Sequence, residues 1–256
     1  MRQDVRFGRI LQRLNESGSV GVAELAEQLG VSEASVRRDL TRLEQQNLLT
    51  RTHGGAAASG VLYELPMRYR GGQHHDAKRA IAAAAVALIT PETASVGLNG
   101  GTTTTEVARA LTGHSGLRVV TNALNIASEL AVRSSIELVV CGGSARPESY
   151  ELVGPLAEQT LAHLNIDIAF IGVDGISPTA GLTTHHEVEA QTNRALAGIA
   201  DRVVVVADSS KLGKRGFARI SDLSMASDLI TDTGAPSDAV DALHGAGLAV
   251  HLVEPA

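Results

Sequence analysis

Apolar residues recur every three or four positions in three separate runs within residues 7–43, which is the spacing that places side chains on one face of a helix. In chain order, the apolar positions of these runs are Phe7, Ile10, Leu11 and Leu14, then Val22, Leu25, Ala26 and Leu29, and then Val36, Leu40 and Leu43. The pattern predicts three short amphipathic helices, and residues 16–21, ESGSVG, separate the first from the second.

The junction between the second and third predicted helices has the residues of a tight turn. Gly30 suits the left-handed position that ends many helices, and Ser32 is a good N-cap for the helix that follows. Two helices joined by a short turn containing glycine form a helix-turn-helix. Residues 47–56, NLLTRTHGGA, then resemble a short strand ended by a Gly-Gly turn, which predicts a β wing. We therefore predict a winged helix-turn-helix domain over residues 1–57.

The exposed side of the third predicted helix carries arginines that suit contact with DNA. In helix-turn-helix proteins the early residues of the second motif helix reach base edges, and an arginine can donate two bonds to guanine or to a phosphate. From the wing, Arg51 and His53 would contact backbone phosphates. An ordinary solvated face on a three-helix unit is the alternative interpretation. The predicted DNA-binding residues are Ser32, Ser35, Arg37, Arg38, Arg42, Arg51 and His53.

A connector is predicted over residues 58–75, where small residues, Pro66 and two glycines interrupt any regular spacing. From residue 76 onward, apolar strands alternate with helical stretches, which is typical of a parallel sheet covered on both faces. We expect the strands at residues 94–98, 117–121, 136–142, 166–173, 202–208, 227–231 and 248–253. The predicted fold class is therefore α/β, with the winged domain joined to a larger Rossmann-like parallel-sheet domain over residues 76–256.

Glycines and polar residues follow five of the predicted strands. At residues 99–104, NGGTTT, the glycines let backbone N–H groups approach a ligand, and a helix start attracts an anion. The stretch lacks the Gly-Lys-Ser/Thr of a Walker P-loop, and a tight turn with Thr102 or Thr103 as N-cap is the alternative. Because ligands of such sheets bind beyond the carboxyl ends of the strands, we expect one site for a small hydroxylated anion. The candidate effector-binding residues are Asn99, Gly100, Gly101, Thr102, Thr103, Thr104, Thr121, Asn122, Gly143, Arg146, Asp174 and Lys211.

Charge and composition narrow the classes of protein. The first 80 residues contain twelve Lys or Arg and nine Asp or Glu, although the chain of 256 residues has a formal net charge of −6. A mildly basic head on an acidic body suits a protein in which only the head meets a phosphate backbone. No apolar run is long enough to cross a membrane. The single cysteine, Cys141, fits a reducing compartment and is expected to be a buried small hydrophobe. We expect a cytoplasmic protein with no cofactor and no metal.

Residues 22–56 resemble the DNA-binding head of the DeoR family of bacterial transcription regulators. The resemblance covers the turn of the helix-turn-helix, the Val-Arg-Arg-Asp-Leu core at residues 36–40 and the Arg-Thr-His-Gly-Gly-Ala wing at residues 51–56. Asn47 stands where the family usually has glycine. Since asparagine tolerates positive φ, we expect the wing turn to be kept.

Stretches that follow the predicted strands resemble the effector domain of the same family, which is similar in fold to ribose-5-phosphate isomerase. The matching stretches are NGGTTT at 99–104, TN at 121–122, GG with Arg146, VGP at 153–155, AFIGVDGIS at 169–177, GLTT at 181–184 and ADSSKLGK at 207–214. The resemblance implies a sugar phosphate or a related phosphorylated metabolite as the effector. Asn99 stands where many members carry aspartate, which removes a negative charge beside the expected ligand.

The resemblance implies a sequence-specific transcriptional regulator of a sugar or carbohydrate operon, by family habit a repressor that its effector releases from a double-stranded DNA operator. A sugar-phosphate isomerase with an appended DNA-binding head is the alternative, and an architectural DNA-binding protein without a ligand is a third interpretation. Those isomerases continue their Asp-Gly with further acids, whereas Asp174-Gly175 is followed here by Ile176, Ser177 and Pro178, so we expect no enzyme. Because helix-turn-helix proteins pair two heads across half-sites, we expect a homo-dimer or homo-tetramer.

Overall fold

The computed structural model describes residues 3–46, 48–58, 66–70 and 74–255. The chain divides into two compact units, Met1–Gln73 and His74–Ala256. Within the predicted connector lies a short helix, α4 (Met67–Arg70), which belongs to the first unit. The remainder of the connector at 59–65 and 71–73, and Asn47 at the expected wing turn, lie outside the described residues.

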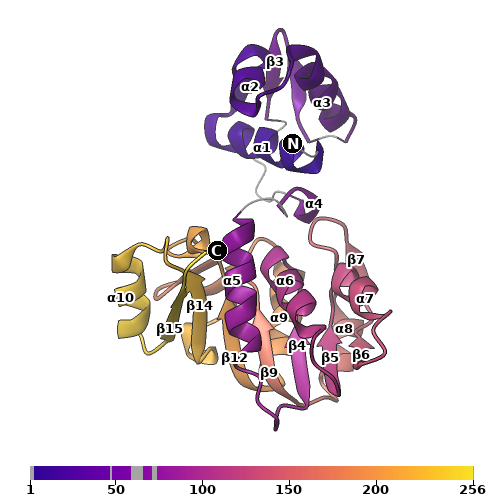
Figure 1. The fold of residues 1–256 in the computed structure, drawn as a ribbon, viewed down its shortest axis with the longest axis vertical. Helices are drawn as coiled ribbons and strands as arrows, with labels where there is room; N and C mark the ends of the chain where they lie inside the picture. Colours follow the sequence, from indigo (N-terminus) through magenta and orange to yellow (C-terminus); the bar gives the residue numbers. More distant parts are fainter. Residues whose placement is uncertain (1–2, 47, 59–65, 71–73, 256) are drawn as a thin grey trace. The chain divides into compact units, whose positions relative to one another are not determined.

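The first unit is a winged helix-turn-helix, as the apolar spacing predicts. Its helices are α1 (Gln3–Ser17), α2 (Val22–Leu29) and α3 (Glu33–Gln45), drawn in indigo in Figure 1. Gly30 ends α2 with a left-handed φ of 64°, and the Ser32 hydroxyl caps α3 by accepting a hydrogen bond from the Ser35 N–H at 3.2 Å. The predicted apolar positions of all three helices pack into one core, and of these positions only Ala26 is partly exposed.

The wing is a three-stranded antiparallel sheet, in the order β1-β3-β2. Its strands are β1 (Ser19–Gly21), β2 (Thr50–Thr52) and β3 (Gly55–Ala57). Strand β1 comes from the segment that sequence periodicity treats only as a break between helices, and it pairs with β3, whose residues lie far along the chain. A strand of three residues is too short to show an alternating pattern, so only the tertiary structure identifies it.

The second unit is built around a seven-stranded parallel sheet with the strand order β15-β14-β12-β9-β4-β5-β6. All seven predicted strands are confirmed as its members. Their bounds are β4 (Ser95–Leu98), β5 (Leu117–Thr121), β6 (Ile136–Val140), β9 (Ile166–Ile171), β12 (Ala200–Val206), β14 (Asp228–Asp232) and β15 (Ala249–Val253).

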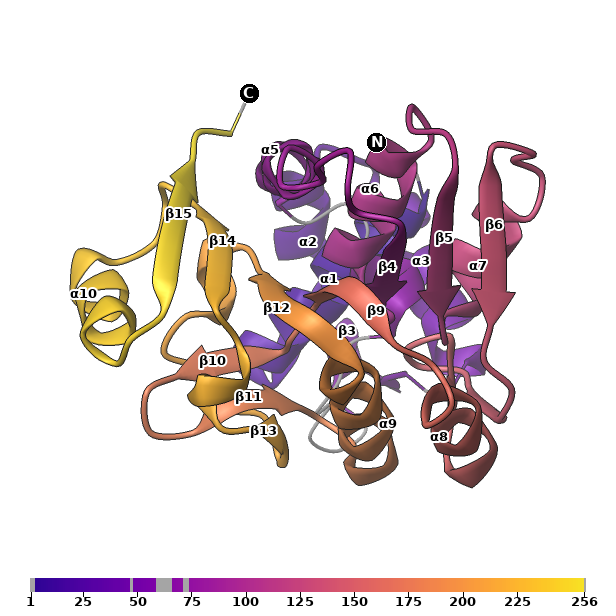
Figure 2. The same cartoon turned by 90° about the horizontal axis from the view of Figure 1, so that it is seen from below.

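Helices cover both faces of this sheet, which explains why its strands are apolar on both sides. On one face lie α5 (His75–Val86), α6 (Thr102–Leu111) and α7 (Leu124–Leu130). The other face is covered by α8 (Pro155–Leu161), α9 (Glu187–Gly198) and α10 (Ser237–Gly245). Figure 2 shows the sheet edge-on between α5 and α6 on one side and α8 and α9 on the other.

Smaller antiparallel elements extend from the carboxyl ends of the strands, where the sequence pattern predicts only loops. A two-stranded hairpin joins β7 (Ser144–Arg146) to β8 (Glu151–Val153). A three-stranded sheet contains β10 (Gly175–Ser177), β11 (Gly181–Thr184) and β13 (Ala218–Ser221). Of the candidate effector residues, Arg146 lies on β7 and Asp174 directly precedes β10. These elements bring side chains from distant parts of the sequence to one end of the sheet.

Candidate DNA-binding surface and effector site

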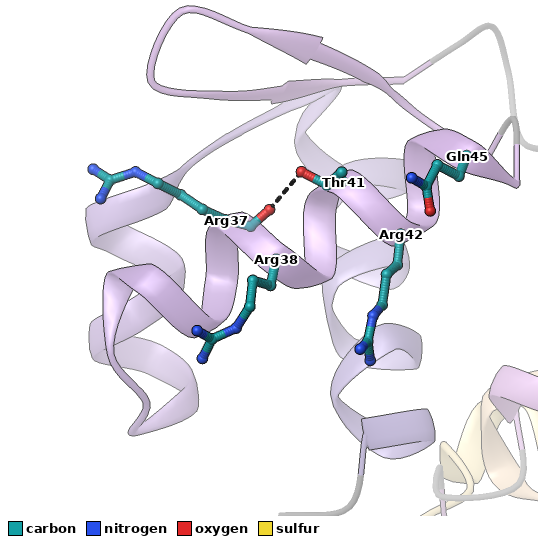
Figure 3. A pocket seen from close by; sticks show the side chains of 5 residues that line it. All are labelled: Arg37, Arg38, Thr41, Arg42 and Gln45. Atoms are coloured by element: carbon teal, nitrogen blue, oxygen red, sulfur yellow. Dashed lines mark hydrogen bonds between the residues drawn. The ribbon is translucent and has the colours of Figure 1, made fainter.

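The exposed face of α3 forms a shallow hollow of about 350 Å³. Its lining residues are Arg37, Arg38, Thr41, Arg42 and Gln45, all shown in Figure 3. In that view Arg38 and Arg42 point to the same side of the helix. Three arginines in two turns of an exposed helix make a surface of positive charge that suits an anionic partner.

Among the described residues, the side chains of Arg37 and Arg38 bond to neighbours on α3 or at its start. Arg37 pairs with Glu33 one turn earlier, at 2.6 Å between Nη2 and Oε2. Arg38 donates to the Ser35 hydroxyl at 3.2 Å, and that hydroxyl lies 3.0 Å from the hydroxyl of Ser32. Exposed pairs of this kind are weak, so the guanidinium groups can exchange these partners for a stronger anion at little cost.

Arg51 lies on the wing, as predicted, but its guanidinium donates bonds within the protein. Its Nη1 donates to the Arg37 carbonyl at 3.2 Å and to the Thr41 hydroxyl at 3.0 Å, and its Nε donates to the Gly55 carbonyl at 3.3 Å. These bonds fasten the wing to α3. His53 is exposed in the turn between β2 and β3.

The opposite side of α3 is held by a buried ion pair that the sequence analysis missed. Asp39 is 2% exposed, and Arg6 on α1 donates to both of its carboxylate oxygens, one of them at 3.0 Å. The hydrogen bond to Asp39 raises the pKa of Arg6 above its ordinary value. Two parallel bonds fix the orientation of the Arg6 guanidinium relative to the Asp39 carboxylate as well as the distance between them. The sequence shows Asp39 beside the apolar positions of the third helix, but this local pattern does not indicate that Arg6 is its partner.

In the second unit, the order in which the chain adds strands to the parallel sheet reverses between β4 and β9. The chain runs from β4 to β5 and β6 on one side, while β9, β12, β14 and β15 lie on the other. Parallel sheets of this kind bind ligands at the carboxyl ends of the strands beside such a switch point. Asn99 follows β4 here and is 1% exposed. Its amide donates to the Gly172 carbonyl at 3.0 Å and accepts from the Gly172 N–H at 2.8 Å, which ties the ends of β4 and β9 together.

The glycine stretch after β4 leads directly into α6, with Gly101 as the N-cap at a φ of 138°. The alternative interpretation, with Thr102 or Thr103 as N-cap, is therefore wrong, because both residues lie within the helix. The Thr104 hydroxyl donates back to the Gly101 carbonyl at 3.1 Å. The Gly100 N–H meets a side chain of the protein itself, since it donates to Oε1 of Glu151 at 2.6 Å.

Thr121 and Asn122 extend this site from β5, and both are fully buried. The Thr121 hydroxyl donates to the Leu98 carbonyl at 2.7 Å. The Asn122 amide donates to the Leu152 carbonyl at 3.3 Å, while its Oδ1 has no hydrogen-bond partner among the described residues. The two residues therefore connect the ends of β4, β5 and β8, and one acceptor there remains unsatisfied.

A second cluster joins three polar residues of the antiparallel elements and α9. The Thr184 hydroxyl lies 2.6 Å from Oε1 of Glu189 and 3.0 Å from Oδ2 of Asp174. A hydroxyl carries one proton and can donate it to one carboxylate at a time. Arg146 pairs with Glu189 at 3.0 Å, and Lys211 lies 3.6 Å from Asp174. The carboxylates of Glu189 and Asp174 are therefore each paired with a cation.

Glu151 links this cluster to the glycine stretch. It is 1% exposed, and its Oε2 has no hydrogen-bond partner among the described residues. Burial raises the pKa of Glu151 well above its usual range, and the nearby charges of Glu189 and then Asp174 add to the effect. Nothing in the local sequence singles out Glu151, because an acidic residue between two apolar ones is typical of an ordinary edge strand.

A buried ion pair lies beside Lys211 in the segment after β12. Lys78 of α5 lies 3.5 Å from Asp208, and both side chains are almost fully buried. Burial acts to raise the pKa of Asp208, but the Lys78 ammonium, the Ser210 hydroxyl and the charge of Lys211 together outweigh burial, and the net shift is downward. Gly143, another predicted site residue, lies between β6 and β7 with a φ of 131°.

Cys141 is buried, as expected, and burial raises its pKa to about 11, which leaves it a poor nucleophile. Within the described ranges, no three His, Cys, Asp or Glu side chains are grouped so that they could hold a metal ion. None of the described helices is both long enough and apolar enough to span a bilayer.

These features define a two-part protein, in which a winged helix-turn-helix unit precedes an α/β unit with polar residues gathered at the switch point of its sheet. The model of the DeoR-like helix-turn-helix domain matches residues 6–59, and that of the DeoR C terminal sensor domain matches residues 73–233. The chain belongs to the DeoR family.

Relatives match over nearly the whole chain. The putative aga operon transcriptional repressor of Escherichia coli O157:H7 is 37% identical, over 97% of this chain and 93% of that protein. The glycerol-3-phosphate regulon repressor of Escherichia coli K12 is 31% identical, over 95% of this chain and 96% of that protein. Among solved structures, ribose 5-phosphate isomerase A of Methanocaldococcus jannaschii is 22% identical with a TM-score of 0.41, over 54% of this chain and 55% of that one.

Proposed function

We propose that this protein is a transcriptional repressor that binds double-stranded DNA through α3 and is released from it by a phosphorylated sugar. The observation that carries the proposal is the exposed arginine face of α3, which is held from both sides within the first unit. The Arg6–Asp39 pair fixes one side of the helix, and Arg51 fixes the wing to the other. A rigid helix that presents arginines is suited to the major groove.

In this proposal Arg38 and Arg42 contact bases or phosphates, Arg37 contacts a phosphate, and Ser32 and Ser35 bond to the backbone near the start of α3. His53 reaches the backbone from the tip of the wing. Arg51 contributes mainly by holding the wing, because three of its hydrogen bonds are made within the unit. The names of the relatives support a repressor, since two of them are called an operon repressor and a regulon repressor.

The effector site is proposed at the ends of β4, β5 and β9. Backbone N–H groups at Gly101 and the start of α6 suit a phosphate, while carboxylates and amides suit sugar hydroxyls. The unpartnered oxygens of Asn122 and Glu151 support a ligand that forms hydrogen bonds there. Arg146 and Lys211 would add positive charge if the phosphate drew them from Glu189 and Asp174.

Regulation is favoured over catalysis by the residues after Asp174. Ile176, in β10, stands where the isomerases carry acids, and its apolar side chain is fully buried, so it offers no group for proton transfer. We therefore propose a non-enzymatic sensor unit, a cytoplasmic location and a homo-dimer or homo-tetramer that pairs two heads on one operator. The effector must then bind better to one arrangement of the heads than to another, since equal affinity shifts nothing.

A gel-shift assay tests the proposal. Purified protein is mixed with duplexes from upstream of its own and neighbouring genes, with and without a panel of pentose, hexose and glycerol phosphates. We expect one fragment to be retarded and one phosphate to reduce the retardation. Binding that is equally tight to all fragments, or turnover of a sugar phosphate without any DNA binding, would contradict the proposal.

A further inference from the structure

The helix α4 lies outside both stretches that match the family models, yet it packs within the first unit. Tyr69 is 6% exposed, and its ring packs against that of Phe7 on α1 with centroids 5.8 Å apart and an interplanar angle of 52°. Met67 is also buried. A helix of four residues has little stability of its own, so these contacts hold α4 in place.

Gly8 in α1 provides independent support for this contact. Glycine is unfavourable in the interior of a helix, and the apolar spacing of α1 gives no reason for it. A Cβ atom at position 8 would lie 2.2 Å from the carbonyl oxygen of Tyr69, a distance that real structures do not tolerate. The glycine therefore lets α4 approach α1 closely, and a larger residue would push α4 away.

Arg68 is held beside the end of α3 by this packing. Its Nη2 donates to Oε1 of Gln46 at 3.2 Å, and the Tyr69 hydroxyl donates to the same oxygen. Its guanidinium carbon also lies 4.9 Å from the centre of the Tyr69 ring. The side chain is exposed, and only one of these contacts uses an N–H donor. Arg68 thus presents a preorganised cation at the surface with donors left for an anion.

The two arginines that bond to α3 lie on different sides of it. Arg51 bonds to positions 37 and 41, whereas Arg68 bonds to Gln46, which is one turn after Arg42. Successive residues of a helix are rotated by about 100°, so Arg42, one turn before Gln46, faces a different direction from the row through 37 and 41. A helix in the major groove has a phosphate backbone on each side.

We propose that α4 contacts the DNA backbone beside α3, on the side of α3 opposite the wing, and that Arg68 binds a phosphate there. The proposal rests on the DNA binding proposed above, and it adds a contact that the helix-turn-helix motif itself does not contain. Arg68 supplies affinity that is independent of sequence, because a phosphate is the same at every base pair.

The test measures how the affinity of the full chain for a mixed-sequence duplex of about 30 base pairs depends on salt, where each phosphate contact contributes roughly 0.9 to the slope. Arg68→Gln should lower the slope by about 1 and weaken binding equally on all sequences. Arg13→Gln is the matched control, because Arg13 belongs to the same unit but pairs with Glu16 and Glu24. It should leave the slope unchanged.

Gly8→Ala tests whether docking of α4 is what places Arg68. It should reduce the slope as much as Arg68→Gln does, and the double variant should show no further loss. Circular dichroism of each variant checks that the helices remain folded. Tyr69→Phe, which removes only the hydroxyl bond to Gln46, should have a smaller effect than Gly8→Ala.

A slope that falls with Arg38→Gln but not with Arg68→Gln would overturn this inference and leave the proposed function intact. Equal losses with Arg68→Gln and Arg13→Gln would also overturn it, since they would reflect net charge alone. Absence of any DNA binding by the unmodified chain at low salt would instead refute the proposed function.

Discussion

Asn99 and Gly172 are joined by two hydrogen bonds, of 2.8 and 3.0 Å. These bonds connect the ends of β4 and β9, the neighbouring strands between which the strand order reverses. The Asn99 amide both donates and accepts, which a carboxylate cannot do. The residue that stands where many family members have aspartate therefore has a structural use here, because it closes the junction between β4 and β9.

Asn99→Asp should lower the free energy of unfolding by about 1–3 kcal/mol at pH 7, because the Gly172 carbonyl loses its donor and a charge is buried. A protonated aspartate restores the donor, so the folded state should raise the pKa of the new carboxyl. The loss should then be small at acidic pH and grow as the pH rises through that pKa. Urea unfolding at pH 4 and pH 7 measures both values, and an equal loss at the two pH values would contradict this account.

Glu151→Gln should stabilise the protein, and the gain should grow with pH. The raised pKa of Glu151 means that its neutral form suits the fold. Wild-type stability therefore falls as the pH rises above the ordinary pKa of glutamate, about 4.3, whereas glutamine keeps an acceptor for Gly100 and no charge. Unfolding at pH 5 and pH 8 measures the difference.

Glu137→Gln provides the control for that experiment. The hydrogen bond from Arg118 lowers the pKa of this exposed carboxyl, so any contribution it makes to stability is lost only as the pH falls below the ordinary range. Between pH 5 and pH 8 its substitution should have a constant effect. A Glu151→Gln effect that is equally constant would show that Glu151 is charged throughout.

Arg38→Ala should weaken binding to the operator fragment by roughly 1–3 kcal/mol if Arg38 makes a bidentate contact with a base. Because Arg38 is exposed in the hollow of α3, the substitution should leave the thermal unfolding temperature unchanged. Binding isotherms on the operator and on a mixed-sequence duplex separate base contact from phosphate contact. A loss of the same size on both duplexes would assign Arg38 to the backbone.

Lys211→Ala should weaken the response to the effector and leave DNA binding unchanged when no effector is present. Lys211 lies 3.6 Å from Asp174 in the proposed effector site, and no operator contact is proposed for it. The concentration of sugar phosphate that releases half of the operator measures the response. Lys214→Ala, at an exposed lysine three residues later, serves as the control. An unchanged midpoint for Lys211→Ala would mean that the effector binds elsewhere.

The sequence alone determined the three helices of the first unit and the seven strands of the parallel sheet in the second, since periodicity is a local property that neighbouring residues set. It also located the strand ends at which polar residues gather, and the motifs around Arg38 and Asp174 that indicate the family. Tertiary structure decided the partners of those residues. Asp39 meets Arg6, Gly100 meets Glu151, and Asn99 meets Gly172 across separations of 33, 51 and 73 residues. Contacts over such separations depend on how the elements pack, and no local pattern records them.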